Sequence, residues 1–240
     1  MKQQRAYAEN DPMQLHAAVP QISEQDDWEA LWESESLICQ WLATLFSAEL
    51  DAATLARYRE GEAAPLLAHL RETHGLEAET ERLERALAGL VMFPAPQLEL
   101  AADFAGLFLT DARIGAPPYA SLYAERAFLG QAAERMAVRL SAAGYTVKSD
   151  LGEPADHLAV MLDYLAARCQ SLVGASKPDE VGKDIKTFME QELCTWLPAF
   201  VLRCKQVATA SDFYPALAVL TAAYIRGLCS LRGPLTGTQN

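Results

Sequence analysis

Residues 27–46, DWEALWESESLICQWLATLF, decide the fold class of this chain. Their large apolar side chains recur at intervals of three and four, which places them on one wide face of a helix. The members of this stripe are Trp28, Leu31, Trp32, Leu37, Ile38, Trp41, Leu42, Leu45 and Phe46. A stripe of this width predicts a long helix that is buried against other helices.

The composition of the whole chain predicts that the rest of the protein is also α-helical. The 240 residues include 42 Ala and 34 Leu, but only 10 Val and 5 Ile. Ala and Leu favour helices, and the β-branched residues that favour strands are scarce. Apolar residues make up 51 % of the chain, which excludes a disordered protein, and no apolar run is long enough to span a membrane. We expect a bundle of about nine to ten helices in two parts joined by a hinge.

Breaks in the periodicity divide the chain. Residues 1–25 show no period and are expected to form a mobile extension. The connector 145–153 separates an N-terminal helical domain, residues 26–150, from a C-terminal helical domain, residues 151–240. The expected helices after the first lie near 51–61, 65–74, 77–92, 97–109, 128–143, 154–173, 179–194, 196–207 and 212–230.

The charge of the chain restricts its partners. Lys and Arg number 20 against 32 Asp and Glu, a net charge of −12. Residues 1–157 hold 12 basic and 25 acidic side chains, and residues 158–240 hold 8 and 7. Nucleic acid and anionic membranes both require a basic face, so we expect neither nucleic acid binding nor stable membrane association. The acidic surface serves either solubility or the attraction of a basic ligand.

Enzyme signatures are absent from the sequence. No phosphate-binding loop, zinc-protease motif or nucleophile elbow is present, so we expect no enzyme and no catalytic residue. The histidines are too dispersed to suggest a metal site, and His69 and His74 are expected on a helix surface. The N-terminus has no secretory signal, which indicates the cytoplasm. The cysteines lack pairing spacing and are expected to be free and structural: Cys39, Cys169, Cys194, Cys204 and Cys229.

Two short motifs stand out. In EPADH, residues 153–157, Pro154 suits the first position of a helix and places Asp156 in the first turn, partly buried beside free backbone amides. This motif is either a helix start or a ligand site at the hinge. An acid–base pair of Asp156 and His157 is disfavoured, because adjacent helical residues point about 100° apart. In APPYASLY, residues 116–123, two prolines and two tyrosines either cap a core or present aromatic rings to an extended peptide.

Together the motifs resemble one family. EPADH, the run LELAADFAGLFL at 98–109, PYASLY at 118–123, WLPAF at 196–200 and Phe213-Tyr214 are similar to the TorD family of cytoplasmic chaperones for molybdenum enzymes. The resemblance spans residues 35–230 approximately and implies an all-helical protein that binds a twin-arginine signal peptide and the apo-core of a periplasmic molybdenum reductase. Such a chaperone aids molybdenum-cofactor insertion and delays export until maturation.

The resemblance also implies a client-binding site and a client. The residues it indicates are Tyr119, Ser121, Tyr123, Glu153, Pro154, Asp156 and His157. The client would be a reductase of the trimethylamine N-oxide type. The alternatives are a dimethyl sulfoxide reductase or other oxidoreductase as client, or a GTP-regulated binding protein. No cofactor is expected apart from weak GTP binding, and the chain is expected to be a monomer or a domain-swapped homodimer.

Overall fold

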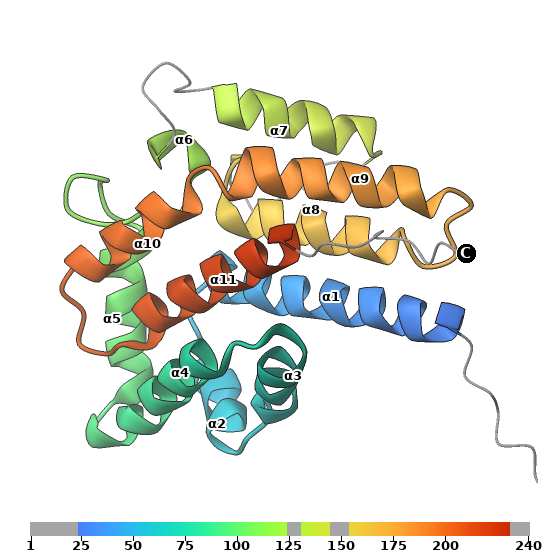
Figure 1. The fold of residues 1–240 in the computed structure, drawn as a ribbon. Helices are drawn as coiled ribbons and strands as arrows, with labels where there is room; N and C mark the ends of the chain where they lie inside the picture. The colour runs from blue at the N-terminus through green and yellow to red at the C-terminus, as the bar shows by residue number, and fades with distance from the viewer. Residues whose placement is uncertain (1–23, 124–130, 145–153, 231–240) are drawn as a thin grey trace, which may run out of the picture.

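The computed structural model describes residues 24–123, 131–144 and 154–230 (Figure 1). Within these ranges the chain is helical apart from its turns and one isolated β-bridge, so the all-α prediction is confirmed. The helices are α1 Glu24–Ser47, α2 Ala52–Arg59, α3 Ala64–His74, α4 Glu77–Gly89, the 3₁₀ turn η1 Leu90–Met92, α5 Pro96–Phe108, α6 Ala120–Tyr123, α7 Gln131–Ala142, α8 Leu158–Gln170, α9 Pro178–Phe188, the π-helical turn η3 Met189–Leu193, α10 Leu197–Gln206 and α11 Phe213–Ser230.

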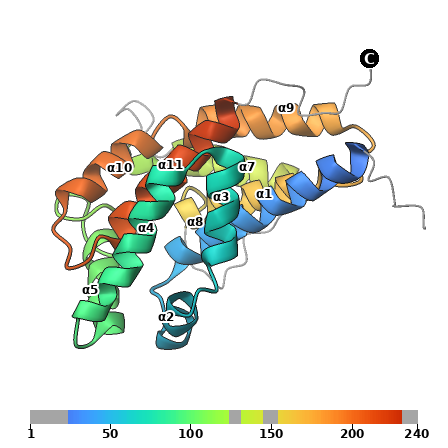
Figure 2. The ribbon, with the colours of Figure 1, turned by 60° about the horizontal axis from the view of Figure 1, so that its bottom comes forward.

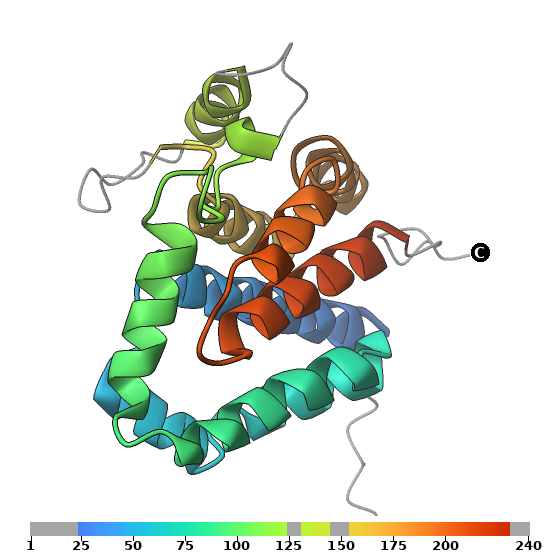
Figure 3. The same ribbon diagram turned by 90° about the vertical axis from the view of Figure 1, so that its left-hand side faces the viewer.

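The helices form a layered bundle. Helix α1 packs along α8, and α9 packs on α8 in turn (Figure 1). Helix α11 packs against both α4 and α10, and α4 runs beside it when the lower side of the bundle is turned forward (Figure 2). Viewed from the side, α5 stands across the ends of the other helices and forms a corner with α4 around α11 (Figure 3). The bundle thus places α11 in its centre.

The predicted stripe of α1 is buried for most of its length. Trp32, Ile38 and Phe46 are enclosed, whereas Leu31 and Leu37 are 36 % and 60 % exposed. The buried face is therefore narrower than the sequence indicated, because these two side chains are exposed to solvent. The same face also buries a carboxylate, that of Glu35, at 1 % exposure.

Two predicted helix ends are confirmed. The Asp51 carboxylate accepts a hydrogen bond of 2.7 Å from the Thr54 amide and caps α2. Gly75 ends α3 in the left-handed conformation, with a φ of 64°, which glycine adopts without the steric cost of a Cβ.

The division into two domains stays a prediction. Residues 1–23 of the expected extension and the whole connector 145–153 lie outside the described residues. Helix α1 of the predicted N-terminal part packs along α8 of the predicted C-terminal part, and buried residues of both parts join one hydrophobic core.

Charged groups attach α7 to this bundle. Glu192, in the π-helical turn, is 5 % exposed and accepts hydrogen bonds of 2.9–3.1 Å from the Arg135 guanidinium. Arg139 lies 3.5 Å from the same carboxylate and 3.6 Å from Asp184, which also pairs with Arg168 at 3.2 Å. These ion pairs connect α7 with α9, η3 and α8.

All five cysteines are free. Cys39, Cys169 and Cys204 are buried, as expected of structural thiols. Cys194 and Cys229 are half-buried, and their Sγ atoms lie 2.9 Å apart although the residues are 35 positions apart in the chain.

Helix α11 is the one described helix whose length and composition suffice to cross a membrane. Two thirds of that segment, 67 %, are buried inside the bundle. Its apolar character is therefore explained by its central position in the core.

Candidate functional site

The structure joins the two motifs that the sequence singled out. The backbone amide of Ala120 donates to the Asp156 carbonyl at 3.1 Å, and the amide of Leu158 donates to the Pro118 carbonyl at 2.8 Å. These bonds form an antiparallel bridge between Tyr119 and His157. We call the segments 117–123 and 154–158, held together in this way, the junction. It connects the loop after α5 with the start of α8.

The side chain of Asp156 points into the junction. Its Oδ2 accepts a hydrogen bond of 2.9 Å from the backbone amide of Ser121, 35 residues away, and the residue is 1 % exposed. His157 is 5 % exposed, its ring lies edge-on to Tyr119 at 5.0 Å, and its Nδ1 accepts from the Ala159 amide at 3.2 Å. Both residues thus serve the backbone of the junction.

These contacts correct the expected helix start. Helix α8 begins at Leu158 with His157 as its N-cap, so Pro154 and Asp156 lie in the turn before it. The expected partial burial of Asp156 and His157 is also wrong. The first two amides of α8 are already bonded, to Pro118 and to the His157 ring, because the loop from α5 packs over this helix end.

The residues of the junction differ in their access to solvent. Tyr119 and Ser121 are partly exposed, and Pro154 is exposed. Glu153, the remaining predicted site residue, lies outside the described residues. The outer face of the junction is therefore formed by Tyr119, Ser121, Leu122 and Pro154.

Tyr123 belongs to an aromatic cluster. Its ring stacks on Trp196 at 5.7 Å and meets Phe200 edge-on at 5.7 Å, which fixes α6 against α10. Burial raises the pKa of the Tyr123 phenol far above its ordinary value. Its hydroxyl has no hydrogen-bond partner among the described residues. APPYASLY was expected either to cap a core or to present aromatic rings to a peptide. The position of Tyr123 favours the first interpretation.

The loop that carries the junction is tied to α10. Arg203 donates to the carbonyls of Gly115 and Arg113, both at 2.7 Å. A Cβ at Gly115 would lie 2.1 Å from Thr110 Oγ1 and 2.8 Å from the Leu107 carbonyl. Only glycine fits this close approach, so the loop leaves α5 in one fixed path.

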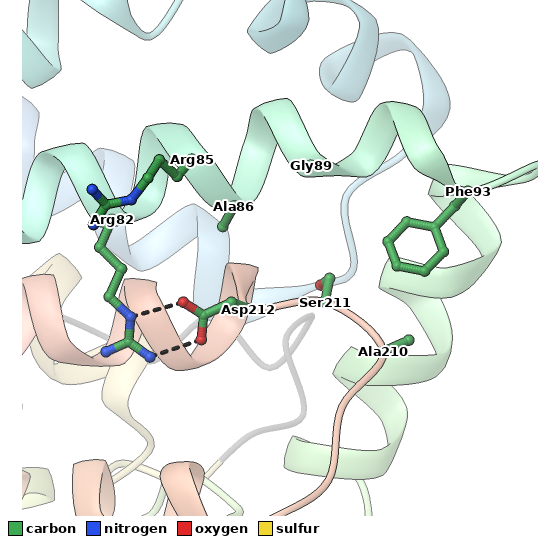
Figure 4. A pocket seen from close by; sticks show the side chains of 8 residues that line it. All are labelled: Arg82, Arg85, Ala86, Gly89, Phe93, Ala210, Ser211 and Asp212. Atoms are coloured by element: carbon green, nitrogen blue, oxygen red, sulfur yellow. Dashed lines mark hydrogen bonds and ion pairs between the residues drawn. The ribbon is translucent and has the colours of Figure 1, made fainter.

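A second buried carboxylate holds the loop before α11, and the sequence reasoning missed it. Asp103 of α5 is 6 % exposed and accepts hydrogen bonds of 2.7 and 2.8 Å from the amides of Ala210 and Ser211. This loop borders a pocket of about 490 Å³ beside α4, across which Arg82 and Asp212 form two bonds of 2.7 Å (Figure 4). The signal was an aspartate on the apolar face of LELAADFAGLFL.

Asp156 and His157 bond to two different parts of the backbone at the junction. Asp156 Oδ2 accepts from the Ser121 amide, and His157 Nδ1 accepts from the Ala159 amide. The site thus belongs to an all-helical class of protein in which buried carboxylates hold loops in place.

Comparison with known proteins agrees with this class. The family described as "Nitrate reductase delta subunit" matches residues 69–202. Chaperone protein TorD of Vibrio cholerae serotype O1 (strain M66-2) is 40 % identical over 198 residues, 81 % of this chain and 90 % of the relative. Chaperone protein TorD of Psychrobacter sp. (strain PRwf-1) is 31 % identical over 210 residues, 85 % and 94 % of the two chains. The chain belongs to the TorD family and is a chaperone rather than an enzyme.

Proposed function

We propose that this chain is a cytoplasmic chaperone for a molybdenum reductase of the trimethylamine N-oxide type. It binds the twin-arginine signal peptide and the apo-core of that enzyme, aids insertion of the molybdenum cofactor and delays export until maturation. The observation that carries the proposal is the junction, because it joins two of the motifs behind the family resemblance, EPADH and PYASLY, through backbone and side-chain hydrogen bonds.

The negative charge of the chain favours binding of the basic end of such a peptide. The net charge of −12 is concentrated in residues 1–157, where acids outnumber bases by more than two to one. A twin-arginine segment would be drawn toward this field, which raises the rate of association and orients the peptide. Exposed charges are screened beyond about 8 Å at physiological ionic strength, so association should slow as salt is added.

Exposed apolar side chains favour binding of the apolar part of the signal peptide. Ile114 and Leu122, in the same loop and helix as the junction, are 68 % and 43 % exposed. Leu109 at the end of α5 is 69 % exposed, and Leu202, next to the Arg203 that binds this loop, is 59 % exposed. We propose that these side chains contribute to one apolar surface, because contiguous exposed apolar groups mark interaction sites. Their burial under a peptide supplies affinity at about 25 cal/mol per Å².

The junction residues then divide into two roles. Tyr119, Ser121 and Pro154 face outward and would contact the peptide, with Glu153 next to them in the chain. Tyr123, Asp156 and His157 hold the shape of that surface from below. Substitution of the second group would therefore affect affinity mainly through stability.

Calorimetry with synthetic signal peptides tests the proposal. We expect binding at one site, and a loss of binding when both arginines of the peptide are replaced by alanine. The Ile114→Ala, Leu122→Ala double variant should bind about tenfold more weakly, a change of about 1.4 kcal/mol. Val138→Ala on α7, whose side chain is 64 % exposed, is the matched control and should bind as the wild type does. Equal affinity for all three proteins would place the peptide elsewhere.

Additional arms of the same experiment test the client and the nucleotide. A tighter complex with the signal peptide of a dimethyl sulfoxide reductase would reassign the client. Competition by GTP against the peptide would support the alternative of a GTP-regulated binding protein. Light scattering of the complex distinguishes a monomer from a domain-swapped homodimer.

A further inference from the structure

A buried carboxylate meets two imidazoles where α1, α3 and α11 pack together. Glu35 lies in the apolar stripe of α1, three residues after Trp32 and four before Cys39, at 1 % exposure. His69 and His74 come from α3, and the His74 side chain is 7 % exposed. One possible ligand atom of each residue lies within 4.8 Å of the other two. The expectation that these histidines lie on a helix surface is wrong for His74.

The polar atoms of this cluster lie close together, with one ion-pair contact between Glu35 and His74 and no hydrogen bond among them. Glu35 Oε1, His69 Nε2 and His74 Nε2 are enclosed and have no hydrogen-bond partner among the described residues. His74 Nε2 lies 3.0 Å from Glu35 Oε1, yet the two atoms are not aligned as a hydrogen bond. Buried polar atoms are normally paired, because leaving them unpaired carries a desolvation cost. Three possible ligand atoms that lie within 4.8 Å of one another are close enough to share one metal ion.

Other atoms of the three side chains contact neighbouring residues, which hold the side chains in place. The Tyr224 hydroxyl of α11 donates to Glu35 Oε2, and Thr73 Oγ1 lies 3.5 Å from His69 Nδ1. The His74 ring packs edge-on against Tyr224 at 5.1 Å. In metal sites, hydrogen bonds of this kind orient carboxylate and imidazole ligands and fix the tautomer of the histidine.

We propose that Glu35, His69 and His74 bind one divalent transition-metal ion, of which Zn²⁺ fits best. Two imidazole nitrogens and one carboxylate oxygen are a donor set that Zn²⁺ accepts, whereas Ca²⁺ and Mg²⁺ prefer oxygen ligands alone. The 3.0 Å between His74 Nε2 and Glu35 Oε1 suits two ligands that each lie about 2.0–2.1 Å from one ion.

The ion would have a structural consequence in this fold. It would link the middle of α1 to the end of α3 and neutralise the carboxylate of Glu35 within the core. The rest of the cluster would then keep Tyr224 and the adjacent Cys39 thiol, 3.7 Å from the Tyr224 hydroxyl, in their places. Metal binding is thus expected to stabilise the folded chain and does not depend on the client peptide.

Metal titration of the tag-free, chelator-treated protein tests this site. We expect one Zn²⁺ per chain by calorimetry and by elemental analysis after gel filtration. With free Zn²⁺ at a hundred times Kd, the Tm should rise by about 5 °C or more. Co²⁺ should give the visible absorption of a nitrogen and oxygen site without the charge-transfer bands of thiolate ligands.

Variants locate the ion within the chain. His69→Gln and His74→Gln should each weaken Zn²⁺ binding by at least about tenfold. His69→Gln leaves the Glu35–His74 pair intact, so its metal-free Tm should stay near that of the wild type. Glu33→Gln, exposed on the same helix, and the Cys194→Ser, Cys229→Ser double variant should keep full occupancy. Absence of bound Zn²⁺ in the wild type, or full occupancy in both histidine variants, would overturn the proposal and leave a metal-free ion pair.

Discussion

At the scale of single residues, buried carboxylates connect segments of the chain that are distant in sequence. Asp103, Asp156 and Glu192 each accept hydrogen bonds from a segment that is distant in sequence. The sequence could predict that Asp156 and His157 matter, because they follow a proline where a helix was expected to begin. It could not predict the partner of Asp156, because the Ser121 amide lies 35 residues away and only the folded loop brings it there.

Replacement of Asp156 by alanine is expected to destabilise the fold. The Ser121 amide would lose a charged acceptor inside the junction, at a cost of about 1.5–3 kcal/mol in the free energy of unfolding. Asp156→Asn keeps one acceptor oxygen and should cost less. Urea denaturation of the three proteins measures the difference. An unchanged midpoint together with lost peptide affinity would show that Asp156 faces the client instead.

Cys194 is expected to be the thiol that reacts first in the folded protein. A hydrogen bond from Cys229 lowers the pKa of Cys194, whereas burial raises the pKa of Cys204 to about 12. Because the thiolate is the nucleophile, alkylation of Cys194 should begin at a lower pH than that of an ordinary thiol. Mass spectrometry after brief treatment with iodoacetamide identifies the modified cysteine. Cys229→Ala removes the donor and should slow the reaction, and preferential labelling of Cys204 would contradict the assignment.

At the scale of elements, the π-helical turn is the feature that periodicity could not foresee. The sequence predicts one continuous helix over 179–194, whereas the structure changes from α9 to η3 at Met189. The wider turn pairs the Cys194 amide with the Met189 carbonyl and leaves the Glu192 carbonyl to accept from the Trp196 indole at 2.7 Å. The Glu192 carboxylate within this turn also bonds Arg135, 57 residues away, a contact that a local pattern does not contain.

Loss of the Glu192 carboxylate should loosen α7. Glu192→Ala leaves Arg135 and Arg139 without this partner and is expected to lower the free energy of unfolding by about 1.5–3 kcal/mol. Hydrogen exchange should rise first in residues 131–142. Glu190→Ala, which removes an exposed carboxylate 4.0 Å from Lys186, should change stability by less than about 0.5 kcal/mol. Equal protection of α7 in both variants would show that apolar contacts alone hold this helix.

At the scale of the molecule, the sequence predicted most of the helices but not which helices pack against one another. Helical period, Asp51 and Gly75 were enough to place α1 to α5, because these signals are local. The packing of α1 on α8 depends on contacts across more than a hundred residues. The meeting of the two motifs at the junction joins residues that are 35 or more positions apart. No local propensity encodes such contacts.

This packing predicts that the chain unfolds in one step. The core runs through both predicted domains, so neither should melt alone. Urea unfolding followed by tryptophan fluorescence, which reports on Trp32 of α1 and Trp196 before α10, should coincide with unfolding followed by circular dichroism. Two separate transitions would instead support independent domains joined by the hinge at 145–153.

The packing of α1 on α8 also has a consequence during synthesis. Helix α1 ends at Ser47 and its partner begins at Leu158, so a ribosome adding about 5–20 residues per second completes the missing surface about 5–20 s later. During that interval the tryptophan-rich face of α1 has no permanent cover. This chaperone is thus, during its own synthesis, briefly exposed to aggregation through the apolar face of its first helix.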